Sequence, residues 1–293
     1  MTRRFRFGVL LSTATSRQDW LGRCRRAEQS GFDIIAVPDH LGAPAPFAAL
    51  VAAAAVTERV QLTTFVLNSA FYPPALLARE AMTASLLTDG RLELGLGAGY
   101  VRAEFEQVGV SWGTAGERVG HLASTLAQLS QITGQPWPLG WPCRPAAPPV
   151  LIGGHGDRVL RLAAQYSDTV AFSGALMSAD TPPRLVDADA LAERVAFFEA
   201  AAGERAAHIE RNILVQRVVV TDDKAAAVRA VHRRAPYLRP DAALEVPTLL
   251  IGTVAEMTTA LLRRRDRFGI SSVFVRESAV PQFAPVVAAL SGM

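Results

Sequence analysis

Residues 61–97 read QLTTFVLNSAFYPPALLAREAMTASLLTDGRLELGLG, and they decide the fold class. The run at 61–67 is apolar along nearly its whole length, which is typical of a strand covered on both faces. Pro73 and Pro74 stand where a helix is expected to begin, and Asp89-Gly90 makes the turn into a second strand at 91–96. A strand, a helix and a strand in this order indicate a βαβ unit, the element of parallel sheets.

The same alternation continues in both directions along the chain. Ser16 and Asp19 begin a helix that ends at Gly31, and an Ala-rich helix starts at Pro46. We expect strands at 5–11, 33–37, 61–67, 91–96, 150–152, 169–172, 213–220 and 272–275. Eight such strands with right-handed crossovers favour an α/β fold of the (β/α)8 TIM-barrel type, formed by residues 1–293 as a single domain. An open doubly wound sheet is the structural alternative.

Two longer segments are predicted insertions into this barrel. The first follows the fourth strand and includes a helix at 117–131 and a segment rich in Pro and Trp at 135–149. The second, near the seventh strand, covers 239–252 and is a candidate lid. Trp112, Trp137 and Trp141 are expected to line an apolar pocket or to serve as packing anchors.

Composition excludes several classes of protein. Lys224 is the only lysine, which argues against a Schiff-base aldolase barrel. The formal charge of +3 is modest and the basic residues are scattered, so nucleic acid and membranes are not expected as partners. The first apolar run ends at Leu11, too short for a signal peptide, which predicts a cytoplasmic protein. Cys24 and Cys143 lack metal spacing and are expected to be plain thiols.

Glycines gather at two predicted strand ends. Gly153, Gly154, His155 and Gly156 precede a helix, so free N-H groups and the positive helix end would meet there, an arrangement that binds phosphate. A tight turn that needs glycine only for its backbone is the alternative. The glycines at 95, 97 and 99 indicate either a flat ring close to the fourth strand or room for a bulky neighbour.

His40, at the end of the second strand, is the candidate for proton transfer. Imidazole titrates near neutrality, and Asp39 or Asp33 could orient it. The histidines at 121, 208 and 232 are expected on solvated faces, and no metal site is predicted.

Three segments resemble the bacterial luciferase-like flavin and deazaflavin oxidoreductases. They are VPDHL at 37–41, NSAFYPPALLAREAMTASLLTDGRLELGLGAGYVRAEFE at 68–106 and PVLIGGHGDRVLRLAAQYSDTVAF at 149–172, with a weaker likeness at 251–275. Within that superfamily the chain looks closest to the branch that uses coenzyme F420, a deazaflavin that carries hydrides.

The resemblance implies roles for individual residues. A backbone bulge, often with a cis non-proline peptide, would fall at Phe65-Val66 and support the cofactor ring, with Leu67 and Asn68 beside it. The residues that would flank the ring are Asp39, Ala98, Gly99 and Tyr100, and those that would hold the cofactor phosphate are Gly153, Gly154, His155 and Gly156. His40 matches a histidine that several deazaflavin-dependent dehydrogenases use as a base or substrate contact.

The chain also departs from its sugar-phosphate dehydrogenase relatives. Those enzymes carry acidic residues where this chain has Thr13-Ala14 and Tyr100, so glucose 6-phosphate is not the expected substrate. The acidic partner of His40 is unassigned. Glu104 matches a frequent family glutamate for which a structural role and a site role are equally expected.

The predicted function is therefore an F420-dependent oxidoreductase that transfers a hydride between the cofactor and a small-molecule substrate. The first alternative is an FMN-dependent monooxygenase that receives reduced flavin from a partner reductase. Others are a non-catalytic cofactor-binding protein and a cofactor-free phosphate-binding barrel such as an isomerase, which would need a carboxylate base at a strand end. By analogy alone, a homodimer and a flavin or F420 reductase as cofactor supplier are further expectations.

Overall fold

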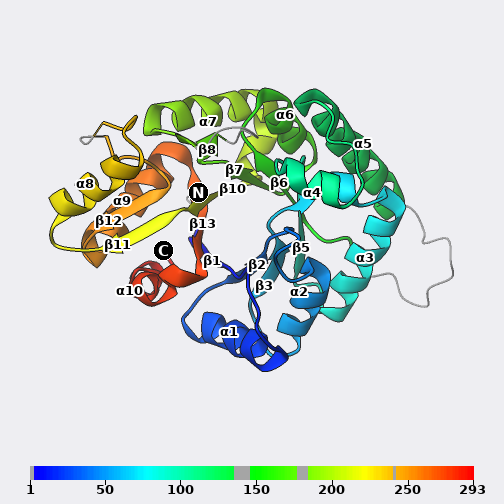
Figure 1. The fold of residues 1–293 in the computed structure, drawn as a ribbon, viewed down its shortest axis with the longest axis horizontal. Coiled ribbons are helices and arrows are strands. Elements are labelled where there is room, and N and C mark those ends of the chain that lie inside the picture. The colour runs from blue at the N-terminus through cyan, green and yellow to red at the C-terminus, as the bar shows by residue number, and fades with distance from the viewer. Residues whose placement is uncertain (1–2, 135–145, 177–183, 240–241) are drawn as a thin grey trace.

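Parallel strands close into a barrel that is ringed by helices (Figure 1). The computed structural model describes residues 3–134, 146–176, 184–239 and 242–293. The barrel strands are β1 (Arg6–Leu10), β2 (Ile34–Val37), β3 (Gln61–Thr64), β5 (Leu92–Gly97), β6 (Val150–Gly154), β7 (Thr169–Phe172), β10 (Glu210–Val215) and β13 (Ile270–Arg276). Leu62 of β3 pairs with Leu92 of β5 and closes the ring, which confirms the predicted barrel over the open sheet.

Helices lie outside the strands, and the first begins at the capping residue that the sequence suggested. The Ser16 hydroxyl accepts a hydrogen bond from the amide of Asp19, and Thr253 and Glu256 form a capping box. The helices are α1 (Arg17–Gln29), α2 (Pro46–Ala54), α3 (Pro74–Leu87), α4 (Arg102–Gln107), α5 (Ala115–Gly134), α6 (Asp157–Tyr166), α7 (Ala188–Ala202), α8 (Lys224–Arg234), α9 (Val254–Phe268) and α10 (Val280–Leu290).

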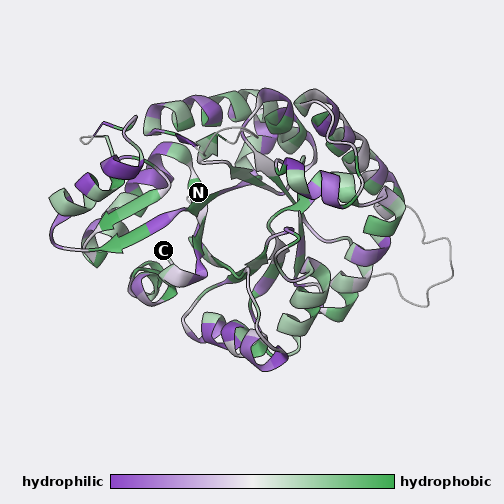
Figure 2. Ribbon diagram, in the orientation of Figure 1, coloured by the Kyte–Doolittle hydropathy of each residue, from purple (hydrophilic) through white to green (hydrophobic). Residues whose placement is uncertain are grey.

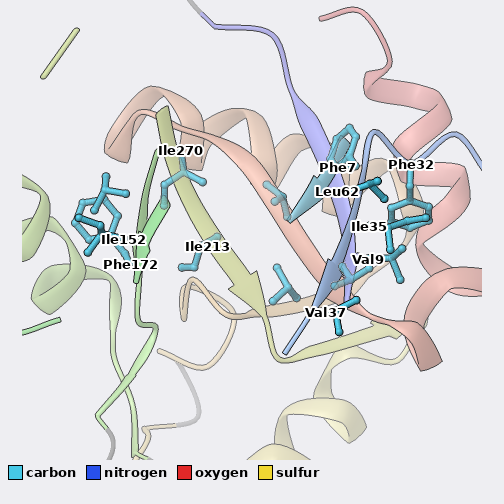
Figure 3. Packing of buried hydrophobic residues seen from close by; sticks show 14 of the residues in the cluster. Phe7, Val9, Phe32, Ile35, Val37, Leu62, Ile152, Phe172, Ile213 and Ile270 are labelled. Carbon is cyan, nitrogen blue, oxygen red and sulfur yellow. The ribbon is translucent and has the colours of Figure 1, made fainter. Parts of the chain in front are cut away.

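The main core lies between the strands and the surrounding helices. Phe7, Val9, Ile35 and Val37 point outward from β1 and β2 and are buried there (Figure 3). Burial of each large apolar side chain contributes about 1.5–3 kcal/mol. The strands are accordingly hydrophobic, while polar residues lie on the outer sides of helices such as α1 (Figure 2).

The strand residues that alternate with this core face the barrel axis. Leu10, Ala36, Leu214 and Phe274 come from four strands and pack together, with the Phe65 ring against them. An apolar plug of this kind fills the barrel, so the chemistry must lie at its ends.

The predicted third strand, 61–67, is interrupted at Phe65. The first part is β3, and the second is a short strand, β4 (Leu67–Asn68), which pairs with Leu96 and Gly97 of β5. The peptide between Phe65 and Val66 is cis, as the resemblance implied.

The prediction of a single seventh strand at 213–220 is wrong, because the structure has two strands there. The first, β10, belongs to the barrel, whereas β11 (Arg217–Val220) leaves it and pairs with β12 (Leu249–Gly252) in a separate sheet. With α8 this sheet encloses a small apolar cluster that includes Val231, Val246 and Ile251. The end of the candidate lid at 239–252 is thus a strand of this sheet.

A second small sheet lies in the connection from β7 to α7. It consists of β8 (Ala175–Leu176) and β9 (Arg184–Leu185), which are antiparallel. The predicted Pro- and Trp-rich segment falls mainly on 135–145, outside the described residues. Among the helices that the structure describes, none has the length and apolar character needed to cross a membrane.

Candidate active site

His40 follows β2 and lies between an acidic and a phenolic side chain. Its Nδ1 is 3.0 Å from Oε1 and 3.2 Å from Oε2 of Glu104, and its Nε2 is 3.2 Å from the hydroxyl of Tyr100. The Tyr100 ring meets the imidazole edge to face at a centroid distance of 5.7 Å. Three strand and helix ends thus converge on one imidazole.

Glu104 reaches His40 from α4, the short helix after β5. Its carboxylate also accepts a hydrogen bond from the amide of Leu41 at 3.3 Å, which fixes it against the loop after β2. The side chain of His40 is 37% exposed and that of Glu104 only 16%, so the imidazole is accessible while its acidic partner is covered. Only Nδ1–H can donate to the carboxylate, which leaves the Nε2 lone pair free to accept a proton.

Tyr100 remains a neutral donor in this arrangement. Burial raises the pKa of its phenol, and the negative charge of Glu104 raises it further. The protonated hydroxyl donates to Nε2 of His40, which is the same lone pair that a substrate proton would reach. The Tyr100 hydroxyl therefore occupies the Nε2 side of His40.

The carboxylate partner of His40 is Glu104. Asp39 and Asp33, the orienting groups that the sequence suggested, are both wrong because each carboxylate is engaged elsewhere. Asp33 accepts from the amide of Phe7, between β1 and β2. Only the family likeness pointed to Glu104, since 64 residues separate it from His40.

Asp39 instead supports the segment after the cis peptide. Its Oδ2 accepts from the amide of Asn68 at 2.9 Å, and its Oδ1 accepts from the hydroxyl of Tyr72 at 3.3 Å. Burial raises the pKa of the Asp39 carboxyl, against the two hydrogen bonds that lower it. The predicted ring-flanking residues Asp39 and Asn68 are thus in contact with each other.

Val66 connects three of the strand ends. A Cβ on Gly97 would lie 2.7 Å from Cγ2 of Val66, and Cβ atoms on Gly95 and Gly153 would lie 3.3 Å from its Cγ1. Gly97 therefore makes room for Val66, the structural alternative weighed from the sequence, whereas a Cβ on Gly95 would first meet the carbonyl oxygen of Thr64 at 1.8 Å. Phe65 packs on Phe274 across the barrel with its ring centroid 4.8 Å away.

The turn after β5 brings further predicted residues to the same place. Gly99 has a φ of +73°, and a Cβ there would lie 2.5 Å from the side chain of Asn68. Ala98 is half-buried against the core, and Tyr100 follows directly. The ends of β2, β3, β5 and β6 are consequently joined in one connected group of side chains.

The glycines at 153–156 lead from β6 into α6. Gly156 is the N-cap of this helix, no side chain caps it, and a Cβ at Gly156 would meet nothing within 4 Å. Uncapped amides beside open space at a helix N-terminus suit an anion such as a phosphate. Gly154 differs, because a Cβ there would lie 2.4 Å from Cγ1 of Val159.

His155 does not fit the role of a cationic phosphate ligand. Its Nδ1 lies 3.3 Å from the carbonyl oxygen of Ser173. Burial lowers the pKa of the imidazole, although the bond to Ser173 raises it, so the neutral form is favoured. Its Nδ1–H therefore donates to protein.

Trp112 is a packing anchor. Its ring lies edge to face with Phe105, 5.0 Å between centroids, and the guanidinium of Arg118 stacks over it at 3.5 Å. Trp137 and Trp141 lie outside the described residues. In the described part of the chain no group of three His, Cys, Asp or Glu side chains could hold a metal ion.

The sequence profile of the luciferase-like monooxygenases matches residues 3–268. The chain belongs to this family. A cis peptide after the third barrel strand, which the family likeness implied, is present, and the glycines at 153–156 lead into a helix without a side-chain cap.

Curated relatives of this family member include F420-dependent enzymes. The 5,10-methylenetetrahydromethanopterin reductase of Archaeoglobus fulgidus is 30% identical over 53% of this chain and 48% of its own length. An F420-dependent glucose-6-phosphate dehydrogenase of Amycolatopsis mediterranei is 36% identical over 36% of this chain and 35% of its own. The chain thus spans about half or less of the length of these relatives.

Solved structures of the luciferase-like fold match over nearly the whole chain. An F420-dependent secondary alcohol dehydrogenase gives a TM-score of 0.76 at 19% identity, covering 98% of this chain and 99% of its own. A long-chain alkane monooxygenase also gives 0.76, at 14% identity, covering 99% and 92%. At these identities the matches establish the fold alone.

Proposed function

We propose that this protein is an oxidoreductase that transfers a hydride between coenzyme F420 and a small organic substrate, with His40 as its acid–base group. The observation that carries the proposal is the contact of His40 Nδ1 with Glu104, which leaves Nε2 to exchange a proton. The F420-dependent glucose-6-phosphate dehydrogenases among the relatives support the choice of cofactor. Both the cofactor and the substrate remain proposals.

The residues present fit this cofactor. Val66 and the residues Ala98–Tyr100 would lie along the deazaflavin ring, and the amides at Gly156 would hold its phosphate. When bound, the deazaflavin accepts or donates a hydride.

His40 supplies the proton chemistry. When an alcohol is oxidised, Nε2 takes the hydroxyl proton and Glu104 stabilises the imidazolium that results. When a carbonyl is reduced, the same proton returns from Nε2 to the oxygen. Tyr100 donates to Nε2 in the absence of substrate and must give way to the substrate hydroxyl.

An FMN-dependent monooxygenase is the second candidate. The match to the profile of the luciferase-like monooxygenases supports it. The alcohol dehydrogenase and the alkane monooxygenase match with equal TM-scores, so the fold alone does not choose between a dehydrogenase and a monooxygenase. A non-catalytic binding protein has no need of an oriented imidazole. A phosphate-binding isomerase would need a carboxylate base at a strand end, whereas the carboxylates of Glu104 and Asp39 are engaged with His40 and Asn68. The homodimer, the reductase that supplies the cofactor and the cytoplasmic location remain predictions.

The test is equilibrium binding of the purified protein to F420 and to FMN, each oxidised and reduced, followed by fluorescence. We expect F420 to bind at least about tenfold more tightly than FMN. A screen of alcohols and carbonyl compounds, followed by the absorbance of F420, then identifies a substrate.

The His40→Gln variant separates binding from catalysis. It should leave the dissociation constant for F420 within about threefold and lower kcat by about a hundredfold or more, the usual contribution of a general base. Tighter binding of FMN would transfer the proposal to the monooxygenase, and binding of neither cofactor would refute it.

A further inference from the structure

Arg276 is the last residue of β13 and faces the barrel axis. Side chains alternate along a strand, so Arg276 lies on the same face as Phe274, which packs with Leu10 and Leu214 inside the barrel. Gln216 lies at the bend between β10 and β11, and its side-chain oxygen accepts hydrogen bonds from Arg276. Arg276 and Gln216 therefore stand at the C-terminal end of the barrel, above its apolar plug.

The guanidinium of Arg276 is held by a neutral group. Gln216 Oε1 accepts from Nη2 at 2.9 Å and from Nε at 3.3 Å. The backbone amide of Gln216 donates to the carbonyl oxygen of Thr248 at 2.8 Å. Both bonds to Oε1 approach the guanidinium from one edge. Nη1 and the second hydrogen of Nη2 consequently remain available.

Nearby carboxylates do not neutralise this cation. Glu277, its neighbour in sequence, pairs with Arg23 at 2.8 Å. Glu104 is bound to His40, and Asp39 to Asn68 and Tyr72. Across the residues that the structure describes, Arg276 forms no ion pair.

Arg276 also acts electrostatically on Tyr100, whose hydroxyl contacts His40. Burial raises the pKa of Tyr100 and Glu104 raises it further, while Arg276 on the opposite side of the barrel lowers it. Arg276 ends β13 and Tyr100 follows β5, so both side chains lie at the same C-terminal end of the barrel as His40.

We infer that Arg276, positioned by Gln216, binds a carboxylate of the substrate, so that the substrate is a small carboxylic acid whose hydroxyl or carbonyl reaches His40. This inference rests on the proposed function. A planar guanidinium with free N-H groups matches a carboxylate in shape. Its single charge suits a monoanion better than a phosphate dianion.

The experiment measures whether the protein prefers a carboxylate to its neutral counterpart. Lactate, 3-hydroxybutyrate and 3-hydroxyhexanoate, each with its amide, are titrated calorimetrically into the protein with and without saturating F420. At least one acid should bind about tenfold or more tightly than its amide, the usual strength of a charge-assisted hydrogen bond.

Arg276→Gln should abolish that preference and leave the affinity for F420 within about threefold. Arg217→Gln is the matched control, because Arg217 is an exposed arginine next to Gln216 in the chain and lies on the following strand, β11. It should retain the preference. Equal binding of acids and amides to the wild type would overturn the inference, and so would a preference that survives in Arg276→Gln.

Two outcomes keep this inference separate from the proposed function. An Arg276-dependent preference in a protein that binds no F420 would support the carboxylate site and refute the cofactor. A loss of F420 affinity of about tenfold in Arg276→Gln, with no acid preferred by the wild type, would assign Arg276 to the cofactor instead.

Discussion

Glu104 and Tyr100 determine which of the two ring nitrogens of His40 carries the proton. Glu104 accepts only, so the neutral imidazole is protonated at Nδ1, and Nε2 accepts from Tyr100. A hydrogen bond to a charged group contributes about 1.5–3 kcal/mol, enough to make one tautomer predominate.

Replacement of Glu104 by alanine should therefore change the tautomer. We expect ¹⁵N NMR of the imidazole at neutral to alkaline pH to show Nδ1–H in the wild type and a mixture of tautomers in Glu104→Ala. Glu106→Ala is the matched control, since Glu106 is on the same helix but pairs with exposed Arg102. An unchanged tautomer in Glu104→Ala would show that the Nδ1 contact does not orient His40.

At the scale of elements, helix α6 begins at an N-cap residue, Gly156, that has no side chain to cap the first amides. Gly156 has an extended conformation (φ −73°, ψ 152°) that any residue adopts, and the space around it is open. Asp is among the best N-cap residues, yet the chain has glycine there. Glycine in place of Asp leaves the first amides of α6 free to bind a ligand.

Gly156→Asp should thus have opposite effects on stability and on binding. The new carboxylate would accept from the helix amides and raise the free energy of unfolding by about 0.5 kcal/mol. The same carboxylate would occupy the phosphate position and weaken F420 binding by about tenfold or more. Thermal melts and fluorescence titration measure the two effects.

Gly156→Ala is the control, because it adds a methyl group without charge and should change the affinity little. If Gly156→Asp is more stable but binds F420 like the wild type, the phosphate does not lie at this helix. Gly154 would be a poor choice for this experiment, because any side chain there collides with Val159.

At the scale of the whole molecule, polar side chains gather at the N-terminal ends of the barrel strands. We call this group the polar floor; it consists of Arg6, Glu93, Thr169 and Glu210. Glu93 of β5 accepts a hydrogen bond from the hydroxyl of Thr169 at 2.7 Å, and Glu210 of β10 lies 3.1 Å from Nη1 of Arg6. Burial raises the pKa values of both carboxyls, although Arg6 and the hydroxyl groups lower them. The two acids also repel each other when both are charged.

This floor makes stability depend on pH. A carboxyl whose pKa is raised by folding binds its proton more tightly in the folded state. Its contribution is complete below the ordinary glutamate value of 4.5 and is lost as the pH rises through the higher folded pKa.

Glu93→Gln removes this titration. The variant should therefore gain about 1 kcal/mol of unfolding free energy over the wild type at pH 8 and less at pH 5. Urea unfolding at the two pH values tests this, with Glu106→Gln as the exposed control. A loss of stability that is equal at both pH values would mean that the charged carboxylate is needed in the floor.

The sequence alone determined the barrel and most of its elements. Local rules suffice there, because apolar runs, capping residues such as Ser16, and turn glycines act over a few neighbouring residues. The family likeness located the cis peptide at Phe65-Val66 and the glycines at 153–156. Residues 213–220 are predicted as one strand because apolar, β-branched residues continue through most of the segment, whereas in the structure β11 pairs with β12 outside the barrel.

Only the tertiary structure decided which side chains act together. Glu104 replaces Asp39 as the partner of His40, Asp39 supports Asn68, and Arg276 meets Gln216 at the barrel end. These contacts join residues from different strands, so they depend on barrel closure and register. The pattern along the chain predicts which face of a strand each side chain lies on. It does not predict the distances between side chains of different strands, which are set only when the barrel closes.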